Sequence, residues 1–422
     1  MSWFSIKLRE LGEFKNGANY PKGSYGEGTK IVNVKDLFRG RYVSYGDLDE
    51  LRPNALKDKS IYLVSHGDLL FTRSSLVKSG AGMVAMINKP IEEVLFCGFI
   101  IRFRPIMEKV SPLFLLYLLR SPSYRKLFTD SSVQTNISNI NQETLGNIEV
   151  TIPSLIEQER IIVLLDSIDS KIELNNRINA ELEAMAKTIY DYWFVQFDFP
   201  FDFSQGKPPK NGRRSEPAEL KPYKSSGGKM VWNEELKREI PEGWEVKRLG
   251  DYAGIKKGTL ITEKTANTNG SIKVVSAGID FSYFHSESNY PENTITISAS
   301  GASAGFINFW REPIFACDCT TIRGRTTSDT LQILGFLQMR QDFIYSQARG
   351  SAQPHVYPKD IEGLLYVVPP SSLVERLGDI LVPGNEKVAV NLKENQQLAY
   401  LRDWLLPMLM NGQVTVKDEA KA

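Results

Sequence analysis

The sequence has few cysteines and no long apolar run. Only three cysteines occur among its 422 residues, Cys97, Cys317 and Cys319. So few cysteines exclude a scaffold held by several disulfides and are typical of a reducing compartment. The longest apolar runs, LFLLYLL (113–119) and WLLPMLM (404–410), are much shorter than the roughly 18 residues of a membrane-spanning helix. The opening stretch MSWFSIKLRELGE lacks the apolar core of a secretory signal, so a cytoplasmic protein is expected.

The sequence also lacks an excess of charge of one sign. Lysine and arginine number 51 and aspartate and glutamate 50, which gives a net charge of +1. A protein that held nucleic acid by electrostatic attraction alone would be more basic. Any surface that binds nucleic acid must therefore be local, or another subunit must supply part of it. The apolar content of 42% and charged content of 24% are those of a folded protein, and the length suits two or more domains.

Several signatures of enzymes are missing. The sequence contains no GxGxxG, no GxxxxGK[ST], no HExxH and no Asn-Pro-Pro-aromatic motif of an adenine methyltransferase. The three histidines, His66, His285 and His355, are isolated, and Cys317-Asp318-Cys319 is too closely spaced for a usual zinc site. The sequence therefore predicts neither a catalytic nor a metal site. The missing motifs leave two functions open. One is a stand-alone DNA-modifying or DNA-cleaving enzyme with an unrecognised site, and the other is a tandem-domain scaffold that binds only proteins.

The sequence repeats itself at a fixed offset. Asn391 and Asn175 are 216 positions apart (391 − 175 = 216), and the same offset relates Pro369 to Pro153. Residues 153–185 and 369–401 share eight identities without a gap. The identical residues of the first copy are Pro153, Glu159, Arg160, Leu165, Lys171, Asn175, Asn179 and Leu182. Such self-similarity predicts a duplicated structure.

Other features recur in the same order in both halves. A tryptophan leads to Leu-Gly and an acid, and a strand-rich stretch follows, at 67–87 and again at 294–310. A helix comes next, from about Ser111 in the first half and from Ser328 or Asp329 in the second, and then a glutamine loop. The fold predicted is α/β, with two globular domains joined by two long helices. The boundaries are 1–153 for domain one, 154–200 for helix one, 201–232 for a linker, 233–369 for domain two, 370–415 for helix two and 416–422 for a tail.

Both long helices carry an apolar stripe with steps of three and four residues, which is typical of a coiled-coil seam. Asn175 and Asn179 lie in the first stripe, and Asn391 and Asn395 occupy the equivalent positions of the second. A buried amide is satisfied only by another polar group, so a polar seam residue fixes the register of two helices. We expect an antiparallel coiled coil with these asparagines facing one another about a pseudo-two-fold axis. The alternative is that they face solvent on ordinary core helices.

Two further features concern the helix ends. Pro383-Gly384 is expected to break or kink the second helix, so that its regular part begins near Asn385. The aromatic run YDYWFVQFDFPFDF (190–203) is expected to pack the end of the first helix against domain two, or else to form a surface for a partner. A similar packing role is expected at the other end, and its residues are Trp404, Leu406 and Met408.

The duplicated plan and four stretches together resemble the specificity subunit of type I restriction-modification systems, over essentially the whole chain. These stretches are WFVQFDFP (193–200), KPYKSSGGKMVWNEELKREIPEGWEVKRLGD (221–251), SAQPHVY (351–357) and LLPMLMNGQV (405–414). The opening of domain one departs from the pattern. No segment like IPEGW precedes Trp3, and LGEFKNG is three residues shorter than LGDYAGIKKG.

The resemblance implies a division of labour among subunits. Each globular domain would be a target recognition domain that reads one half of a split site in double-stranded DNA. The paired helices would space the domains and hold two methyltransferase subunits, which bind S-adenosylmethionine and methylate adenine. A further motor-nuclease subunit would use ATP and Mg²⁺ and cut the DNA, although the sequence does not decide whether the host has one. This chain would be non-catalytic and would hold no cofactor.

Candidate DNA contacts are polar and cationic side chains in short segments between apolar strands. In domain one they are Thr72, Arg73, Ser74, Ser75, Lys78, Gln134, Thr135, Asn136 and Asn139. In domain two they are Lys256, Lys257, Thr259, Ser298, Ser300, Ser303, Arg349, Gln353, His355 and Tyr357. A bidentate Asn or Gln would read adenine and an Arg would read guanine. The alternative is that the serines of SASGASAG (298–305) form turn hydrogen bonds and that Gln134 and Gln353 orient their loops by bonding the backbone.

Overall fold

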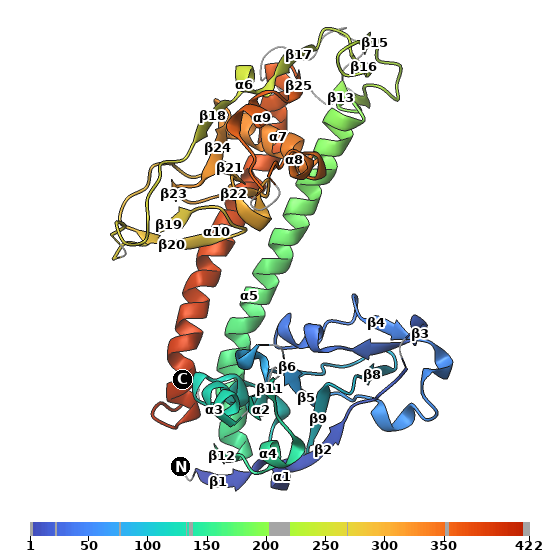
Figure 1. The fold of residues 1–422 in the computed structure, drawn as a ribbon, viewed down its shortest axis with the longest axis vertical. Helices are drawn as coiled ribbons and strands as arrows, with labels where there is room; N and C mark the ends of the chain where they lie inside the picture. Colours follow the sequence, from blue (N-terminus) through green and yellow to red (C-terminus); the bar gives the residue numbers. More distant parts are fainter. Residues whose placement is uncertain are drawn as a thin grey trace, which may run out of the picture. The chain divides into compact units, whose positions relative to one another are not determined.

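The structure is a computed structural model that describes residues 3–21, 23–75, 77–131, 133–134, 138–201, 220–267, 269–350 and 354–416. Its backbone divides into two compact units (Figure 1). Unit 1 comprises Met1–Ile172 and Gln396–Ala422, and unit 2 comprises Glu173–Asn395. Each unit has its own hydrophobic clusters.

Unit 1 combines short strands with helices. The strands are β1 (Phe4–Lys7), β2 (Gly12–Asn16), β3 (Tyr25–Val32), β4 (Asp49–Leu51), β5 (Leu69–Thr72), β6 (Ser74–Ser75), β7 (Val84–Met86), β8 (Val94–Phe96), β9 (Ile100–Pro105), β10 (Val133–Gln134), β11 (Ser138–Asn139) and β12 (Glu149–Ile152). The helices are α1 (Leu8–Leu11), α2 (Pro112–Arg120), α3 (Pro122–Ser131) and α4 (Gln142–Gly146), with 3-10 turns η1 (Val34–Phe38), η2 (Pro53–Ala55), η3 (Ser60–Tyr62) and η4 (Lys78–Gly80).

The central strand of unit 1 is buried on both faces. Leu69 and Phe71 of β5 belong to the cluster that contains Phe114 of α2, whereas Leu70 belongs to the cluster that contains Ile31 of β3. A strand covered on both sides reads as a continuous apolar run rather than an alternating one, as LLFT does. Helix α2 begins at Pro112 after Ser111, as the sequence predicts, because proline suits the first turn.

Unit 2 has the same kinds of element. Its strands are β13 (Pro200–Phe201), β14 (Lys221–Pro222), β15 (Met230–Asn233), β16 (Arg238–Pro241), β17 (Glu245–Arg248), β18 (Gly254–Lys257), β19 (Ile272–Val275), β20 (Phe281–His285), β21 (Thr294–Ser298), β22 (Ile307–Trp310), β23 (Ile314–Ala316), β24 (Cys319–Arg323) and β25 (Leu365–Val368). The helical segments are α6 (Leu249–Tyr252), α7 (Thr327–Gln338), α8 (Gln341–Ser346) and α9 (Pro358–Glu362), with a π-helical turn η5 (Asp191–Val195) and a 3-10 turn η6 (Gly301–Ser303).

The two units repeat one topology, which confirms the internal duplication. A four-stranded antiparallel sheet has the order β2-β9-β5-β7 in unit 1 and β18-β24-β21-β22 in unit 2. The three-stranded sheets, β4-β3-β8 and β20-β19-β23, each contain one parallel pair, and β1-β12 corresponds to β17-β25. The α/β fold class predicted from the sequence is therefore confirmed.

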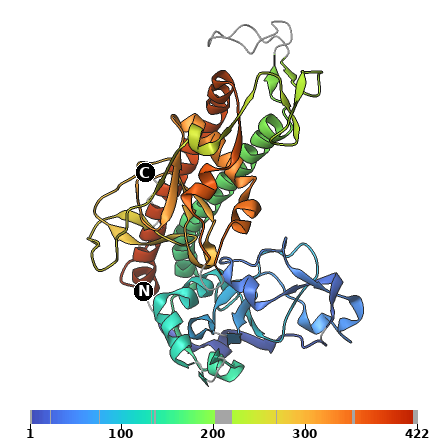
Figure 2. The same cartoon turned by 45° about the horizontal axis from the view of Figure 1, so that its top comes forward.

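Two long helices, α5 (Leu155–Tyr190) and α10 (Ser371–Met410), lie side by side in both ribbon views (Figures 1 and 2). The prediction that Pro383-Gly384 breaks the second helix is wrong, because α10 is helical throughout these bounds. Proline removes the hydrogen bond to the carbonyl four residues earlier. Pro383 and Asp379 both lie on the exposed face of α10, so water can satisfy that carbonyl.

The seam asparagines pair as predicted, within unit 2. The Asn391 Nδ2 atom donates to Asn179 Oδ1 at 2.8 Å, and the Asn175 Nδ2 atom donates to Asn395 Oδ1 at 2.9 Å. Asn175 and Asn391 are 1% and 0% exposed, which excludes the alternative that they face solvent. Residue numbers rise along α5 while those of their partners fall along α10, so the helices are antiparallel. The offset of 216 residues exchanges the two pairs, as a local two-fold relation requires.

A polar network within unit 1 joins α5 and α10 to helix α2 and to Arg41. Asp169 accepts hydrogen bonds from the Tyr117 hydroxyl at 2.7 Å and from Arg402 Nη1 at 2.8 Å. Arg41 donates from Nη1 to Tyr117 Oη at 2.7 Å and to Asp166 at 2.6 Å. Burial, and after it the charge of Asp169, raises the pKa of Tyr117, so the phenol keeps the proton that it donates. The network fixes the helix pair against α2.

We expect Asp169→Ala to destabilise unit 1 strongly. The substitution leaves Tyr117 and Arg402 without their buried acceptor, which costs about 3 kcal/mol. Hydrogen exchange of the α2 amides should report a local free energy of opening that is lower by about this amount. Asp403→Ala is the matched control, because Asp403 also pairs with Arg402, at 2.8 Å, but is 66% exposed. Its effect should stay below about 1 kcal/mol, and equal effects of the two substitutions would contradict the assignment.

The aromatic run packs as predicted, whereas only Leu406 of the three residues expected at the other helix end joins the core, since Met408 is half-buried outside that cluster. Tyr190, Trp193 and Phe197 are buried in the main core of unit 2, and Phe199 stacks on Trp244 with ring centroids 5.2 Å apart. In unit 1 the end of α10 buries Leu406, Leu409 and Met410. Trp404 was expected to join them but is 57% exposed, because the apolar face there continues through Leu405 and Leu409.

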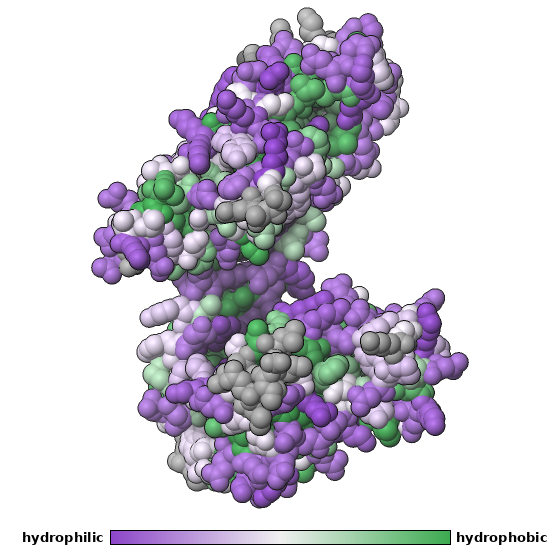
Figure 3. Space-filling model, in the orientation of Figure 1, coloured by the Kyte–Doolittle hydropathy of each residue, from purple (hydrophilic) through white to green (hydrophobic). Residues whose placement is uncertain are grey.

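The remaining surface is mostly polar. The face drawn in Figure 3 is largely hydrophilic in each unit, with hydrophobic residues in separate patches. Among the described residues, none of the helices combines the length and the hydropathy needed to cross a membrane.

Candidate nucleic-acid interface

In unit 1 the structure brings two predicted segments together. Strand β6, which holds Ser74 and Ser75, pairs with β11, which in turn pairs with β10. The Ser74 hydroxyl donates to Asn139 Oδ1 at 2.6 Å, although the two residues are 65 positions apart. Arg73 precedes this small sheet, and its Nη1 atom donates to the Gly98 carbonyl at 3.4 Å. Hydroxyl, amide and guanidinium groups therefore gather at one place.

Unit 2 brings its predicted segments together in the same way. His355 forms isolated bridges with Ser300 and with Arg349. The His355 ring stacks on Tyr357, with centroids 6.1 Å apart, and Tyr357 is 53% exposed. Arg349 also pairs with Asp360 at 3.0 Å while remaining 70% exposed. His355 lies 216 positions after Asn139, so the two units place these residues at equivalent points of the fold.

The basic turn of unit 2 lies at the same end of the sheet. Lys257 is opposite Thr320 of β24, which is opposite Ile297 of β21, one residue before Ser298. Lys256, Lys257 and Thr259 are exposed. Strand β18 is an edge strand, so cationic groups flank the place where Ser300 and His355 meet. This is the arrangement that phosphate contacts beside base contacts need.

Four predicted residues are buried, which corrects their place in the site. Thr72 is 0% exposed and Ser298 3%, because both end central strands of their sheets. Ser75 accepts from the Val77 amide at 3.2 Å, and Ser300 donates to Asp318 Oδ2 at 2.7 Å. The Ser75 hydroxyl therefore bonds within its own turn, whereas the Ser300 hydroxyl bonds to a side chain 18 positions away and not within the SASGASAG turn. None of the four side chains is available at the surface.

Five of the predicted residues have no described side chain. Thr135, Asn136 and Gln353 lie outside the described residues. Lys78 belongs to η4 and Gln134 to β10, and only their backbones are described. Their DNA contacts stay predictions, as do those of the exposed residues.

Sequence reasoning missed two residues of unit 1. The Gly17 amide donates to the Ile100 carbonyl and the Gly258 amide to the Cys319 carbonyl, so KNG (15–17) is equivalent to KKG (256–258). Lys15 is half-buried and Asn16 exposed, and both lie at the same end of the sheet as Arg73. The lysine and glycine that KNG and KKG share could have revealed this equivalence. The segment before KNG is three residues shorter than the segment before KKG, so the two do not align directly.

The segment GASAG (301–305) has the GxSxG spacing of a hydrolase nucleophile elbow. That motif joins a strand to a helix, whereas here η6 joins the antiparallel strands β21 and β22. Gly301 and Gly305 have φ angles of 77° and 91°, which side chains with a Cβ rarely adopt. The turn therefore accounts for both glycines, and Ser303 is half-buried within it.

All three cysteines are buried. Burial raises the pKa of Cys97 to about 11 and that of Cys319 to about 12. Among the described residues, no three His, Cys, Asp or Glu side chains are grouped so that they could hold a metal ion.

These raised pKa values predict alkaline destabilisation. Unfolded thiols ionise near pH 9 and the folded ones do not, so each contributes stability that is complete below pH 9. That stability is lost as the pH rises through about 11 to 12. At pH 10 the loss is about 1.4 kcal/mol per thiol. Urea unfolding between pH 7 and pH 10 should show this decline, and Cys97→Ala with Cys319→Ala should remove the share that the two thiols contribute. Buried tyrosines such as Tyr190, whose pKa burial also raises, account for the rest. An unchanged slope in that variant would contradict the role of the thiols.

Comparison with known proteins points to one family. The chain matches the model of the type I restriction modification DNA specificity domain twice, over residues 2–184 and 241–398. It is 25% identical to the type I restriction enzyme MjaIX specificity subunit of Methanocaldococcus jannaschii, covering 99% of this chain and 94% of that protein. The HindI specificity subunit of Haemophilus influenzae is 22% identical, covering 91% of this chain and 94% of that protein.

A solved structure shares the fold. The S subunit of a type I restriction-modification system from M. genitalium superposes with a TM-score of 0.61 at 17% identity. The alignment covers 99% of this chain and 97% of that one.

Proposed function

Because the chain belongs to the family of type I restriction-modification DNA specificity subunits, we propose that it reads a two-part site in double-stranded DNA. Each unit reads one half through the polar end of its four-stranded sheet. The observation that carries this proposal is the equivalence of Asn139 and His355, which meet Ser74 and Ser300 at the same point of a duplicated fold. Base edges are read by side chains of this kind, and the lysines beside them suit phosphates.

The paired helices set the distance between the half-sites. Their register is fixed by the Asn175–Asn395 and Asn179–Asn391 pairs, so the helix pair presents one length and not a range of lengths. A bipartite site whose intervening bases are not read follows from such a spacer.

The chemistry of modification and cleavage lies in partner subunits. Two methyltransferase subunits that hold S-adenosylmethionine dock on this chain, and restriction subunits, where the host has them, use ATP and Mg²⁺. This chain contributes recognition and no catalysis or cofactor. The burial of Ser300 against Asp318 and the turn role of GASAG support that division, because both account for polar groups that could suggest chemistry.

The half-site assignment is tested by single substitutions in the complex with methyltransferase. Asn139→Ala should relax one half of the methylated motif and His355→Ala the other, each by about tenfold to a hundredfold in discrimination. Gln397→Ala, an exposed polar residue of α10, is the matched control and should change neither half. Sequencing of methylated adenines in treated DNA measures the result. Loss of discrimination in both halves from one substitution, or in neither, would contradict the proposal.

A further inference from the structure

The outer edges of β7 and β22 are equivalent, but only one of them is covered. In unit 1 the Met86 amide donates to the Arg41 carbonyl at 2.9 Å, and the Val43 amide donates to the Met86 carbonyl at 3.1 Å. Tyr42 pairs with Met86 in a parallel bridge, and its ring packs against the main core of unit 1. Residues 40–43 thus extend the sheet beyond β7.

The internal repeat identifies the same position in unit 2. The Thr72 amide bonds to the Met83 carbonyl at 2.8 Å, and the Ser298 amide bonds to the Phe306 carbonyl at 3.0 Å. Counting three residues from each carbonyl, Phe309 of β22 corresponds to Met86 of β7. Backbone groups alternate in direction along a strand, so the Phe309 amide and carbonyl point away from β21. Within the described part of the chain, neither of these two groups has a hydrogen-bond partner.

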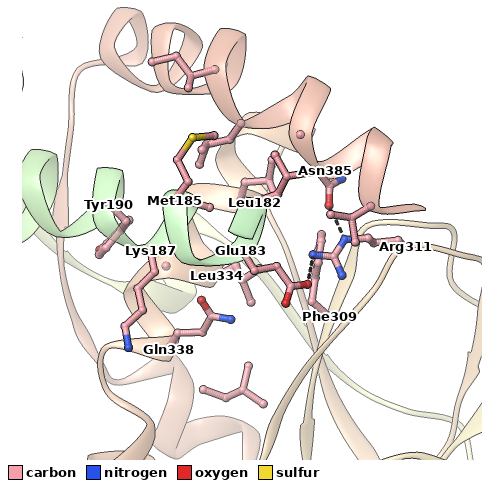
Figure 4. A pocket seen from close by; sticks show the side chains of 18 of the residues that line it. Leu182, Glu183, Met185, Lys187, Tyr190, Phe309, Arg311, Leu334, Gln338 and Asn385 are labelled. Atoms are coloured by element: carbon pink, nitrogen blue, oxygen red, sulfur yellow. Dashed lines mark hydrogen bonds and ion pairs between the residues drawn. The ribbon is translucent and has the colours of Figure 1, made fainter. Parts of the chain in front are cut away.

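A pocket lies beside this open edge. Its volume is about 320 Å³, and its walls come from α5, α7, α10 and β22 (Figure 4). Phe309, Met185 and Leu334 supply apolar surface, and Met185 is 44% exposed. In a parallel pairing the residue opposite Phe309 would place its side chain on the same face as the Phe309 ring. That side chain would therefore reach the pocket.

The charged groups beside this pocket differ from those at the equivalent place in unit 1. Arg41, from the added segment, reaches Asp166 at 2.6 Å and lies 3.8 Å from Asp169. Asn385 of α10 is the counterpart of Asp169 in the repeat (385 − 169 = 216), and it accepts from Arg311 Nε at 2.8 Å. Arg311 also pairs with Glu183 at 2.9 Å. In unit 2 the guanidinium of Arg311 therefore lies where the guanidinium of Arg41 lies in unit 1. Lys187, on the pocket wall, is exposed and has no ion pair within the described residues.

We propose that the groove formed by this pocket and the open edge of β22 docks an extended segment of a partner polypeptide. The segment adds to β22 as residues 40–43 add to β7. The segment places a large apolar or aromatic side chain in the pocket and carries an acidic residue just before it, opposite Arg311 and Lys187. Strand addition of this kind obtains affinity from backbone hydrogen bonds and specificity from alternate side chains. This inference concerns a protein partner and does not depend on how the chain reads DNA.

Two blocked peptides serve as probes with the full-length chain labelled with ¹⁵N-phenylalanine. One has the sequence of residues 40–44, and the other is the same peptide with Arg41→Glu. The acidic peptide should shift the Phe309 amide resonance, assigned through Phe309→Tyr, in a saturable manner at millimolar concentrations. The unaltered peptide should bind about tenfold more weakly, because its arginine meets Arg311.

Two exposed apolar residues give a matched pair of variants. Met185→Ser should weaken the acidic peptide about fivefold by removing apolar pocket wall. Val390→Ser, which changes a residue of α10 that is 58% exposed and lies outside the pocket, should leave binding unchanged. Stronger binding of the unaltered peptide would mean that the groove suits a second copy of this chain, and would overturn the proposal. So would the absence of a shift, insensitivity to Met185→Ser, or a shift with free indole and none with the peptide.

Discussion

Replacing Asn179 and Asn391 together with leucine is expected to stabilise the helix pair, whereas either replacement alone is expected to destabilise it. A single change leaves one buried amide without its partner, which costs about 1 to 3 kcal/mol. The double change replaces a pair that is only partly satisfied, since Asn179 Nδ2 and Asn391 Oδ1 are buried and lack partners among the described residues. Apolar residues at such seam positions are more stable than asparagine.

Hydrogen exchange of the α5 amides in the four chains of this cycle measures the effect. The sign reversal between single and double variants is the expected signature, and additive losses would contradict a paired role. A second consequence concerns register. Without both amide pairs, in the chain that also carries Asn175→Leu and Asn395→Leu, the seam no longer excludes a shifted alignment. Methylated motifs with more than one gap length, or an altered assembly state, should then be found, and unchanged gap and assembly would defeat the register argument.

Lengthening both helices by one matched heptad is expected to move recognition to a longer site. Seven residues inserted after Asn179 and seven inserted before Asn391 keep the pairs on either side in register, because the helices are antiparallel. Seven residues add about 10 Å of helix, which corresponds to about three base pairs of DNA. The original motif should be methylated at least a hundredfold less, because its two halves can no longer be engaged together.

The control is the same insertion in α5 alone. It misaligns every seam residue beyond the insertion, so neither the old nor the longer motif should be methylated well. If the matched insertion leaves the gap unchanged, the helices do not measure it.

The duplicated fold and the amide pairing could be predicted because both leave a strong local signal. An offset of 216 residues and an asparagine inside an apolar stripe are visible in the chain, and each favours one physical interpretation over the other. The continuity of α10 through Pro383 could not be predicted, since it depends on which face of the helix meets water. The exposure of Trp404 could not be predicted either, because it depends on the rotation of α10 about its own axis.

The candidate site was predictable in its segments and not in its individual residues. The composition of the segments around Ser74 and His355 marked them, but their meeting is a product of strand pairing across 65 positions in unit 1 (139 − 74) and 55 in unit 2 (355 − 300). Thr72 and Ser298 resemble surface polar residues in the sequence, yet each closes a central strand and is buried. Lys15 and Asn16 escaped notice because a shorter loop shifts them out of alignment with Lys256 and Lys257.

Sequencing of methylated adenines in a host with and without this chain tests the central claim most directly. The account predicts one bipartite motif, two short read segments separated by a fixed number of unread bases, that appears only when the chain is present. A motif that persists in its absence, or a continuous motif without a gap, would contradict it.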